Sequence, residues 1–124
     1  MYPQALAELR AGKKLSHWMW FMFPQIAGLG RTSTAQYFAI ADRAEAEAYD
    51  RHPVLGPRLV ECTEAMLTWA GKRDARTILG PIDALKFRSS MTLFEECGAN
   101  PDPFAAALDA FYGGERDTVT LELL

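Results

Sequence analysis

Glycine, proline and aspartate residues divide this sequence into short segments, and this punctuation is what most restricts the fold. Within the segments, apolar residues recur every three or four positions, as on one face of an α-helix. The first segment has Pro3 in its first turn, Ala5 and Leu9 at helical spacing, and Gly12 as its stop. We therefore expect an all-α protein, a compact single-domain bundle of about six to eight short helices over residues 1–124.

The same signals define the later helices. We expect Ser16 to cap a tryptophan-rich helix, and Asp42 and Asp74 to cap two others. Apolar residues alternate from Val119 to Leu123 as in a strand, but the rest of the sequence shows no pattern typical of a partner strand. We therefore predict a helix there. The expected helices cover residues 3–11, 17–23, 34–41, 43–51, 57–70, 75–79, 81–97, 103–112 and 117–124.

The composition is that of a folded chain without a strong net charge. Hydrophobic residues make up 49% of the sequence, charged residues 23%, and the net charge is −3. Disorder is therefore excluded, and we expect no nucleic-acid partner, which would need a basic surface. The longest aromatic-rich apolar run, Trp18 to Phe23, is far shorter than the roughly 20 residues of a membrane span. Without a secretory signal after Met1, we expect a cytoplasmic protein with no membrane partner.

Cysteine and histidine do not point to a metal site. Cys62, Cys97, His17 and His52 include no pair at the spacing of zinc ligands. A cytosolic protein keeps its cysteines reduced, and neither cysteine has a basic neighbour in sequence that would activate it. We expect no metal and no cofactor.

Residues 16–25 form a segment that is apolar on every side except at its ends. Such a helix is either buried, with Trp18 and Trp20 filling the core, or it exposes an apolar surface. His17 and Gln25 are the polar groups near its two ends, and they need hydrogen-bond partners if they are buried. His17 is either a structural histidine or an acid–base group, since histidine exchanges protons near neutral pH.

The helix expected at 81–97 carries a narrow polar stripe. At about 100° per residue, Asp83, Lys86 and Ser90 fall within about 60° of one another. Apolar residues such as Ile82 flank the stripe, and we expect them to be buried. A solvated face would be wider, so the stripe is either an internal ion pair or the wall of a cleft. Arg88 lies on the other side of this helix, as a surface residue or an anion ligand.

The loop before the third expected helix contains Gly28, Gly30 and Arg31, which would cradle an anion ahead of a helix capped by Ser33. Gln36, three residues after Ser33, completes a capping box. No strand precedes the loop, so it is not a dinucleotide fingerprint.

Three strings stand out together: Ser16-His17-Trp18-Met19-Trp20-Phe21-x-Phe23-Pro24-Gln25, His52-Pro53-Val54-Leu55-Gly56 and Asp83-x-x-Lys86-x-x-Ser89-Ser90-x-Thr92-Leu93-Phe94. Together they resemble a widespread bacterial domain family of unknown function, some of whose members carry the label calpastatin. The resemblance implies a compact all-helical domain without an established activity. It also implies that the first helix is shortened here, because members usually begin about one helical stretch earlier. A calpastatin-like inhibitor is an extended, disordered chain, so that label does not fit this composition.

Two functions fit these observations. The first is binding or processing of a small nucleotide- or sugar-like molecule in a pocket between the tryptophan-rich helix and helix 81–97. The second is a protein-interaction module that uses the Trp/Met-rich segment. For the first function, the candidate catalytic residues are His17 and Asp83, and the candidate ligand-binding residues are Trp18, Trp20, Gln25, Lys86, Arg88 and Ser90.

The Lys86-Phe87 pair and the helix order after it are similar to a helical family associated with NAD and ADP-ribose, which favours the first function. That family's later Trp-Gly and Gly-Asn-x-Leu-Gly elements are absent from this sequence.

Overall fold

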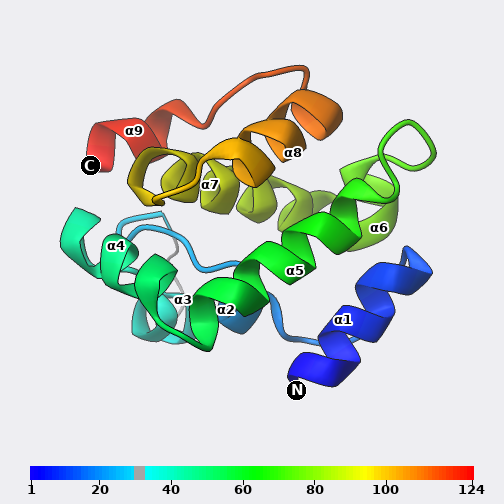
Figure 1. The fold of residues 1–124 in the computed structure, drawn as a ribbon, viewed down its shortest axis with the longest axis horizontal. Coiled ribbons are helices and arrows are strands. Elements are labelled where there is room, and N and C mark those ends of the chain that lie inside the picture. Colours follow the sequence, from blue (N-terminus) through cyan, green and yellow to red (C-terminus); the bar gives the residue numbers. More distant parts are fainter. Residues whose placement is uncertain (30–32) are drawn as a thin grey trace.

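The computed structural model describes residues 1–29 and 33–124, with the side chains of residues 33–35 left out. As predicted, the regular elements of the described part are all helices. Its only pairing of β type is an isolated bridge between Ile26 and Ile40. The helices, labelled in Figure 1, are α1 (Tyr2–Ala11), α2 (Met19–Met22), α3 (Ser33–Phe38), α4 (Arg43–Arg51), α5 (Leu55–Leu67), α6 (Ala75–Leu79), α7 (Pro81–Cys97), α8 (Asp102–Tyr112) and α9 (Thr118–Leu123).

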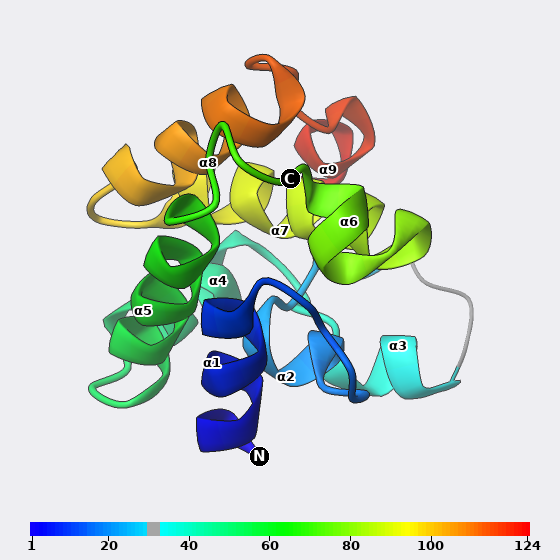
Figure 2. The same cartoon turned by 90° about the vertical axis from the view of Figure 1, so that its right-hand side faces the viewer.

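Helix α7 is the centre of the fold. It packs against α4, α6, α8 and α9, and Figures 1 and 2 show it surrounded by the other helices. Its buried residues include Phe87, Met91, Leu93 and Phe94, which lie on several sides of the helix because neighbours cover it in several directions. Buried apolar side chains from α1, α2 and α4 to α8 join these residues in one hydrophobic cluster.

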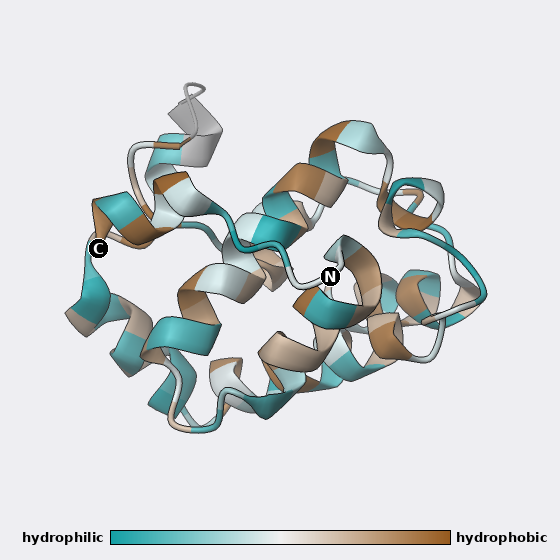
Figure 3. Ribbon diagram, turned by 90° about the horizontal axis from the view of Figure 1, so that it is seen from above, coloured by the Kyte–Doolittle hydropathy of each residue, from teal (hydrophilic) through white to brown (hydrophobic). Residues whose placement is uncertain are grey.

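The outer helices have one apolar face each. In Figure 3, hydrophobic and hydrophilic residues alternate along most of the ribbon, as the periodicity of the sequence predicts. Helix α5 packs against α1, α4 and α8, so it connects the first helix to the later ones. Figure 1 shows it running across the near face of the molecule, between α1 and α8.

Several predicted helix ends are confirmed. The Asp42 carboxylate accepts the backbone N–H of Glu45 at 2.9 Å, and the Asp74 carboxylate accepts that of Thr77 at 2.7 Å. Asp102 precedes the helix expected at 103–112 but is the first residue of α8, and no side chain of the described residues caps that helix. The anion cradle at Gly30 and Arg31 lies outside the described residues, and so does the Ser33 side chain on which the predicted capping box depends.

The tryptophan-rich helix is shorter than predicted. We expected a helix over residues 17–23 capped by Ser16, but α2 covers only Met19–Met22 and begins after Trp18. The Ser16 hydroxyl does not cap α2, because it accepts from the Gln4 carboxamide at 2.6 Å and donates to Glu8 at 2.7 Å, both on α1. Most of the segment is core: Trp18, Met19, Met22 and Phe23 are buried, whereas Trp20 and Phe21 are half-buried.

Candidate functional site

The polar stripe of α7 begins at an ion-pair cluster. The Asp83 carboxylate lies 2.9 Å from the Lys14 ammonium and 3.7 Å from the Lys86 ammonium. All three side chains are mostly buried, with 10% of Lys14, 19% of Asp83 and 27% of Lys86 exposed. One carboxylate therefore faces two cations, and the cluster has a surplus positive charge.

A cavity of about 290 Å³ opens beside this cluster. We call it the Trp20–Lys86 cavity, because the Lys86 ammonium lies 5.0 Å above the centre of the Trp20 ring on its wall. Its lining comes from the α1–α2 connection, from α2 and from the junction of α6 and α7: Lys14, His17, Met19, Trp20, Leu79, Gly80, Pro81, Ile82, Asp83 and Lys86. Figure 2 shows the α1–α2 connection passing below α6 on the near side of the molecule.

The start of α7 adds to the positive field of the cavity. Gly80, the residue before the helix, has φ 90° and ψ 161°, and no side chain caps the helix. The first backbone N–H groups of a helix have no partner inside the helix and carry a partial positive charge. Pro81 has no N–H, so the N–H groups of Ile82 and Asp83 are the ones nearest this end.

A smaller cavity of about 80 Å³ is also lined by Trp20 and Lys86. Gln25 and Gln36 lie in its lining, together with Phe23 and Phe38. Neither glutamine carboxamide has a hydrogen-bond partner within the described part of the protein. Gln25 therefore lines this smaller cavity and not the Trp20–Lys86 cavity, and the two linings share Met19, Trp20 and Lys86.

Of the residues singled out in the sequence, the structure brings His17, Trp20, Asp83 and Lys86 together around one cavity, with Gln25 next to it. His17 is an exposed residue in this lining.

Three candidates lie elsewhere. Trp18 is fully buried, and Ser90 is also fully buried, two turns beyond Asp83, where α7 has entered the core. Arg88 faces away, with its guanidinium 3.7 Å from Glu115 and 6.0 Å from the Tyr112 ring. The expectation for Ile82 is also wrong: it is 69% exposed, because its side of the first turn of α7 faces outward with Leu85, whereas Ala84 on the other side is buried.

Sequence reasoning missed Lys14 and Glu8. The Lys14 ammonium is the second cation next to Asp83, and the Lys14 backbone N–H donates to the carbonyl of Ile78 at 2.7 Å. Lys14 sits in a polar run, Gly12 to Lys14, with no sign in its own neighbours of a partner on α7. For Glu8, the sequence did contain a signal: at about 100° per residue, this charged residue lies beside Ala5 on the apolar face of α1.

Glu8 holds the α1–α2 connection in place. Its carboxylate accepts the backbone N–H of Leu15 at 2.7 Å, that of Ser16 at 3.0 Å and the Trp18 indole N–H at 2.9 Å. Burial by itself raises the pKa of Glu8, but these hydrogen bonds outweigh it and lower the pKa to about 2. The carboxylate is therefore ionised at neutral pH and fixes the chain that carries Lys14 and His17.

Other reactive groups are poorly placed for chemistry. Burial raises the pKa of the Cys62 thiol to about 12 and also raises the pKa of the Cys97 thiol, so neither is an activated nucleophile. Within residues 1–29 and 33–124, no three His, Cys, Asp or Glu side chains gather closely enough to hold a metal ion. None of the helices in that part of the chain is long and apolar enough to cross a membrane.

Comparison with known proteins places the chain in a family. The model of a family described as "Protein of unknown function (DUF1810)" matches residues 1–124. The chain belongs to the DUF1810 family. A crystal structure of the conserved hypothetical protein Rv1873 from Mycobacterium tuberculosis is similar over 99% of this chain and 87% of that one, with 46% sequence identity and a TM-score of 0.95. No protein with a curated function matches the sequence.

Neither the DUF1810 description nor the relative's name states an activity. For this DUF1810 member, the chemistry must therefore be argued from the residues of the cavity. Those residues provide two ammonium groups, a carboxylate, an imidazole and an indole face in one concave place.

Proposed function

We propose that this DUF1810 protein binds a small anionic molecule of the nucleotide- or sugar-like class in the Trp20–Lys86 cavity. One observation carries the proposal: the ammonium groups of Lys14 and Lys86 converge on Asp83 beside the Trp20 ring, in a cavity of about 290 Å³. Apolar walls with a few convergent polar groups are typical of ligand sites, and this volume is close to the lower end of their range.

Each lining residue has a part in this proposal. Lys14 and Lys86 supply the charge that a phosphate or carboxylate needs, and the free N–H groups at the start of α7 add to it. The Trp20 face would stack on a base or a sugar ring. Asp83 would orient the two lysines and accept a hydrogen bond from a ligand hydroxyl.

His17 and Gln25 extend the proposed site. Gln25 offers an amide to the polar edge of a ring that reaches the smaller cavity. His17 lines the larger cavity, and it would act as the acid–base group if the ligand is processed there.

The second function, protein docking through the Trp/Met-rich segment, has less support. It requires an exposed aromatic face, but Trp18, Met19 and Phe23 are buried. Trp20 and Phe21 remain half-buried, and Trp20 lines cavities rather than a flat surface. A ligand cavity accounts for these positions better than a docking face does.

Thermal-shift and NMR titrations with nucleotides, NAD metabolites, sugars and sugar phosphates test the proposal. We expect a phosphorylated compound to raise the melting temperature and to shift the signals of Trp20, Asp83 and Lys86. Lys14→Met and Lys86→Met should each weaken that binding about tenfold or more, because each removes a charge-assisted contact.

Lys13→Met is the matched control, because Lys13 is the exposed neighbour of Lys14 and lines neither cavity. His17→Asn should keep the binding and lose any turnover. The proposal is wrong if no anionic compound of the panel binds, or if Lys13→Met weakens binding as much as Lys14→Met does.

A further inference from the structure

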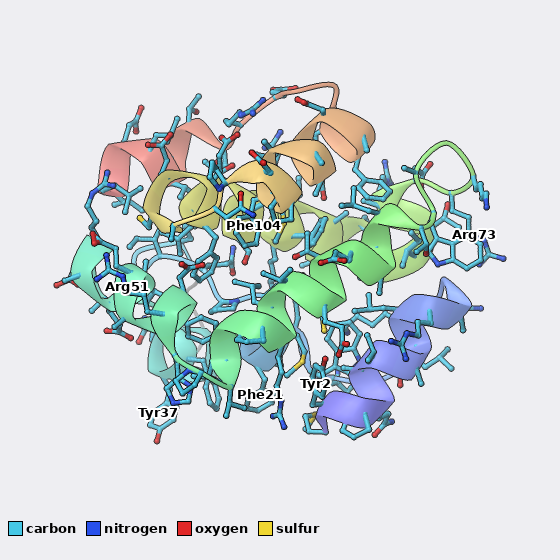
Figure 4. The ribbon with its side chains drawn as sticks, in the orientation of Figure 1. Tyr2, Phe21, Tyr37, Arg51, Arg73 and Phe104 are labelled. Carbon is cyan, nitrogen blue, oxygen red and sulfur yellow. The ribbon has the colours of Figure 1, made fainter. Side chains whose placement is uncertain are left out.

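A third cavity, of about 410 Å³, lies between the start of α1 and helices α2 to α5. We call it the aromatic pocket, because five of its lining residues carry rings: Tyr2, Trp20, Phe21, Phe38 and Tyr49. Its other lining residues are Met1, Met22, Pro24, Leu55 and Arg58. Figure 4 shows Tyr2 and Phe21 near each other at the lower edge of the molecule, whereas Tyr37 points away from it.

The rings pack in a fixed arrangement. The Phe21 and Phe38 rings meet edge to face with their centres 4.6 Å apart. The Tyr49 hydroxyl donates to the backbone carbonyl of Phe21 at 3.2 Å, which ties α4 to α2. Burial raises the pKa of Tyr49 to about 12, so this phenol stays protonated and neutral. The wall of the pocket is thus apolar and already shaped before any ligand arrives.

Arg58 is the only charged side chain among the described residues that line this pocket. Its guanidinium lies 4.5 Å from the centre of the Tyr2 ring, and no carboxylate of the described residues is within 4.0 Å of it. Glu61, one turn further along α5, instead accepts the hydroxyl of Tyr2. A guanidinium that stacks on a ring keeps its in-plane N–H groups free for a planar anion.

We propose that the aromatic pocket binds a small carboxylate with an apolar, ring-bearing body. The ring of the ligand would lie against Phe21, Phe38 and Tyr49, and its carboxylate would accept two hydrogen bonds from Arg58. Charge complementarity supports this class of ligand, because five aromatic rings and an unpaired guanidinium match an apolar body that carries a planar anion.

This site is separate from the one under "Proposed function". Lys14, Asp83 and Lys86 do not line the aromatic pocket, and Arg58 does not line the Trp20–Lys86 cavity. Among the described residues, Trp20 alone belongs to both of these linings, whereas the smaller cavity beside Gln25 shares Trp20, Pro24 and Phe38 with the aromatic pocket. Variants at Arg58 and at Lys86 therefore test the two sites independently.

An NMR titration of the full chain with 3-phenylpropionate, and with its uncharged amide, tests the proposal. We expect saturable shifts at Phe21, Tyr49, Leu55 and Arg58 with the acid, and binding of the amide at least tenfold weaker. Arg58→Gln should weaken binding of the acid about tenfold or more, whereas Arg58→Lys should restore part of it.

Arg51→Gln is the matched control, because Arg51 is 73% exposed, lies outside the pocket lining and sits on neighbouring α4. Lys86→Met should bind the acid as the wild type does. The proposal is overturned if the acid does not bind saturably, if the amide binds equally well, or if Arg51→Gln weakens binding as much as Arg58→Gln. Shifts confined to Asp83 and Lys86 would also overturn it, and would place the acid in the other cavity.

Discussion

The Glu8 carboxylate on α1 accepts the Trp18 indole N–H at 2.9 Å, and both side chains are buried. The same carboxylate accepts backbone N–H groups from the residues between them, so one charged group fixes the whole α1–α2 connection. Because Lys14 and His17 belong to this connection, Glu8 positions part of the Trp20–Lys86 cavity without lining it.

Glu8→Gln should lower the free energy of unfolding at neutral pH by about 1–3 kcal/mol, because the hydrogen bonds lose their charged acceptor. The pKa of Glu8 is about 2 in the folded protein, below its ordinary 4.5. The stabilisation is therefore complete above about pH 4.5 and is lost as the pH falls toward about 2. Urea unfolding across this window should show a shallower pH dependence in Glu8→Gln than in the wild type. The exposed Glu122→Gln is the control, and equal slopes for all three proteins would contradict the assignment.

Trp18→Ala should cost about 3–5 kcal/mol of unfolding free energy, because it empties a fully buried site and leaves Glu8 without one of its donors. Trp20→Ala should cost less, since Trp20 is half-buried and its indole N–H has no partner in the described residues. Urea melts of the two variants measure the difference. Equal losses would show that the two tryptophans share the core equally.

Removal of the Thr92 hydroxyl and removal of the Ser90 hydroxyl, both on α7, should change the free energy of unfolding by different amounts. Thr92 accepts the backbone N–H of Asp117 at 3.0 Å and donates to the carbonyl of Arg88 at 2.8 Å, so Thr92→Val should cost about 1–3 kcal/mol. The Ser90 hydroxyl is buried and finds no partner among the described residues, so Ser90→Ala should stay within about 0.5 kcal/mol or stabilise the protein. Thermal unfolding of both variants tests this, and a large loss in Ser90→Ala would refute it.

Gly12→Ala should destabilise the protein more than Gly71→Ala. The two glycines have nearly the same backbone, with φ of 76° and 77°, so both substitutions cost about 1–2 kcal/mol of left-handed strain. A Cβ at Gly12 would also lie 2.7 Å from the Trp69 ring, whereas one at Gly71 meets nothing within 4 Å. The ring contact should add roughly 1–3 kcal/mol, measured as the difference between two urea melts. No difference would mean that the ring moves aside freely.

The all-helical fold could be predicted from the sequence because its signals are local. A cap such as Asp42 or Asp74 bonds a backbone group three residues away, and Gly12 ends α1 through its own backbone angles. For a segment that is apolar on every side, burial of Trp18 or Trp20 was one of the two alternatives, and Trp18 is the one that is fully buried. The short α2 was missed because Ser16, a local cap candidate, bonds to Glu8 on another helix.

The candidate site could be predicted only in part. Helical periodicity gives the direction in which each side chain leaves the helix axis, but it does not say how deeply each turn of the helix is buried. Asp83 and Ser90 share a side of α7, yet Asp83 lines a cavity whereas Ser90 is fully buried, because different neighbours lie against this side two turns apart. By itself, the sequence determined that the chain forms helices, where several of them end, and that Asp83, Lys86 and Ser90 share one side of α7. Only the tertiary structure decided that Lys14 is the partner of Asp83 and that Arg58 faces an aromatic pocket, because both contacts join residues far apart in the chain.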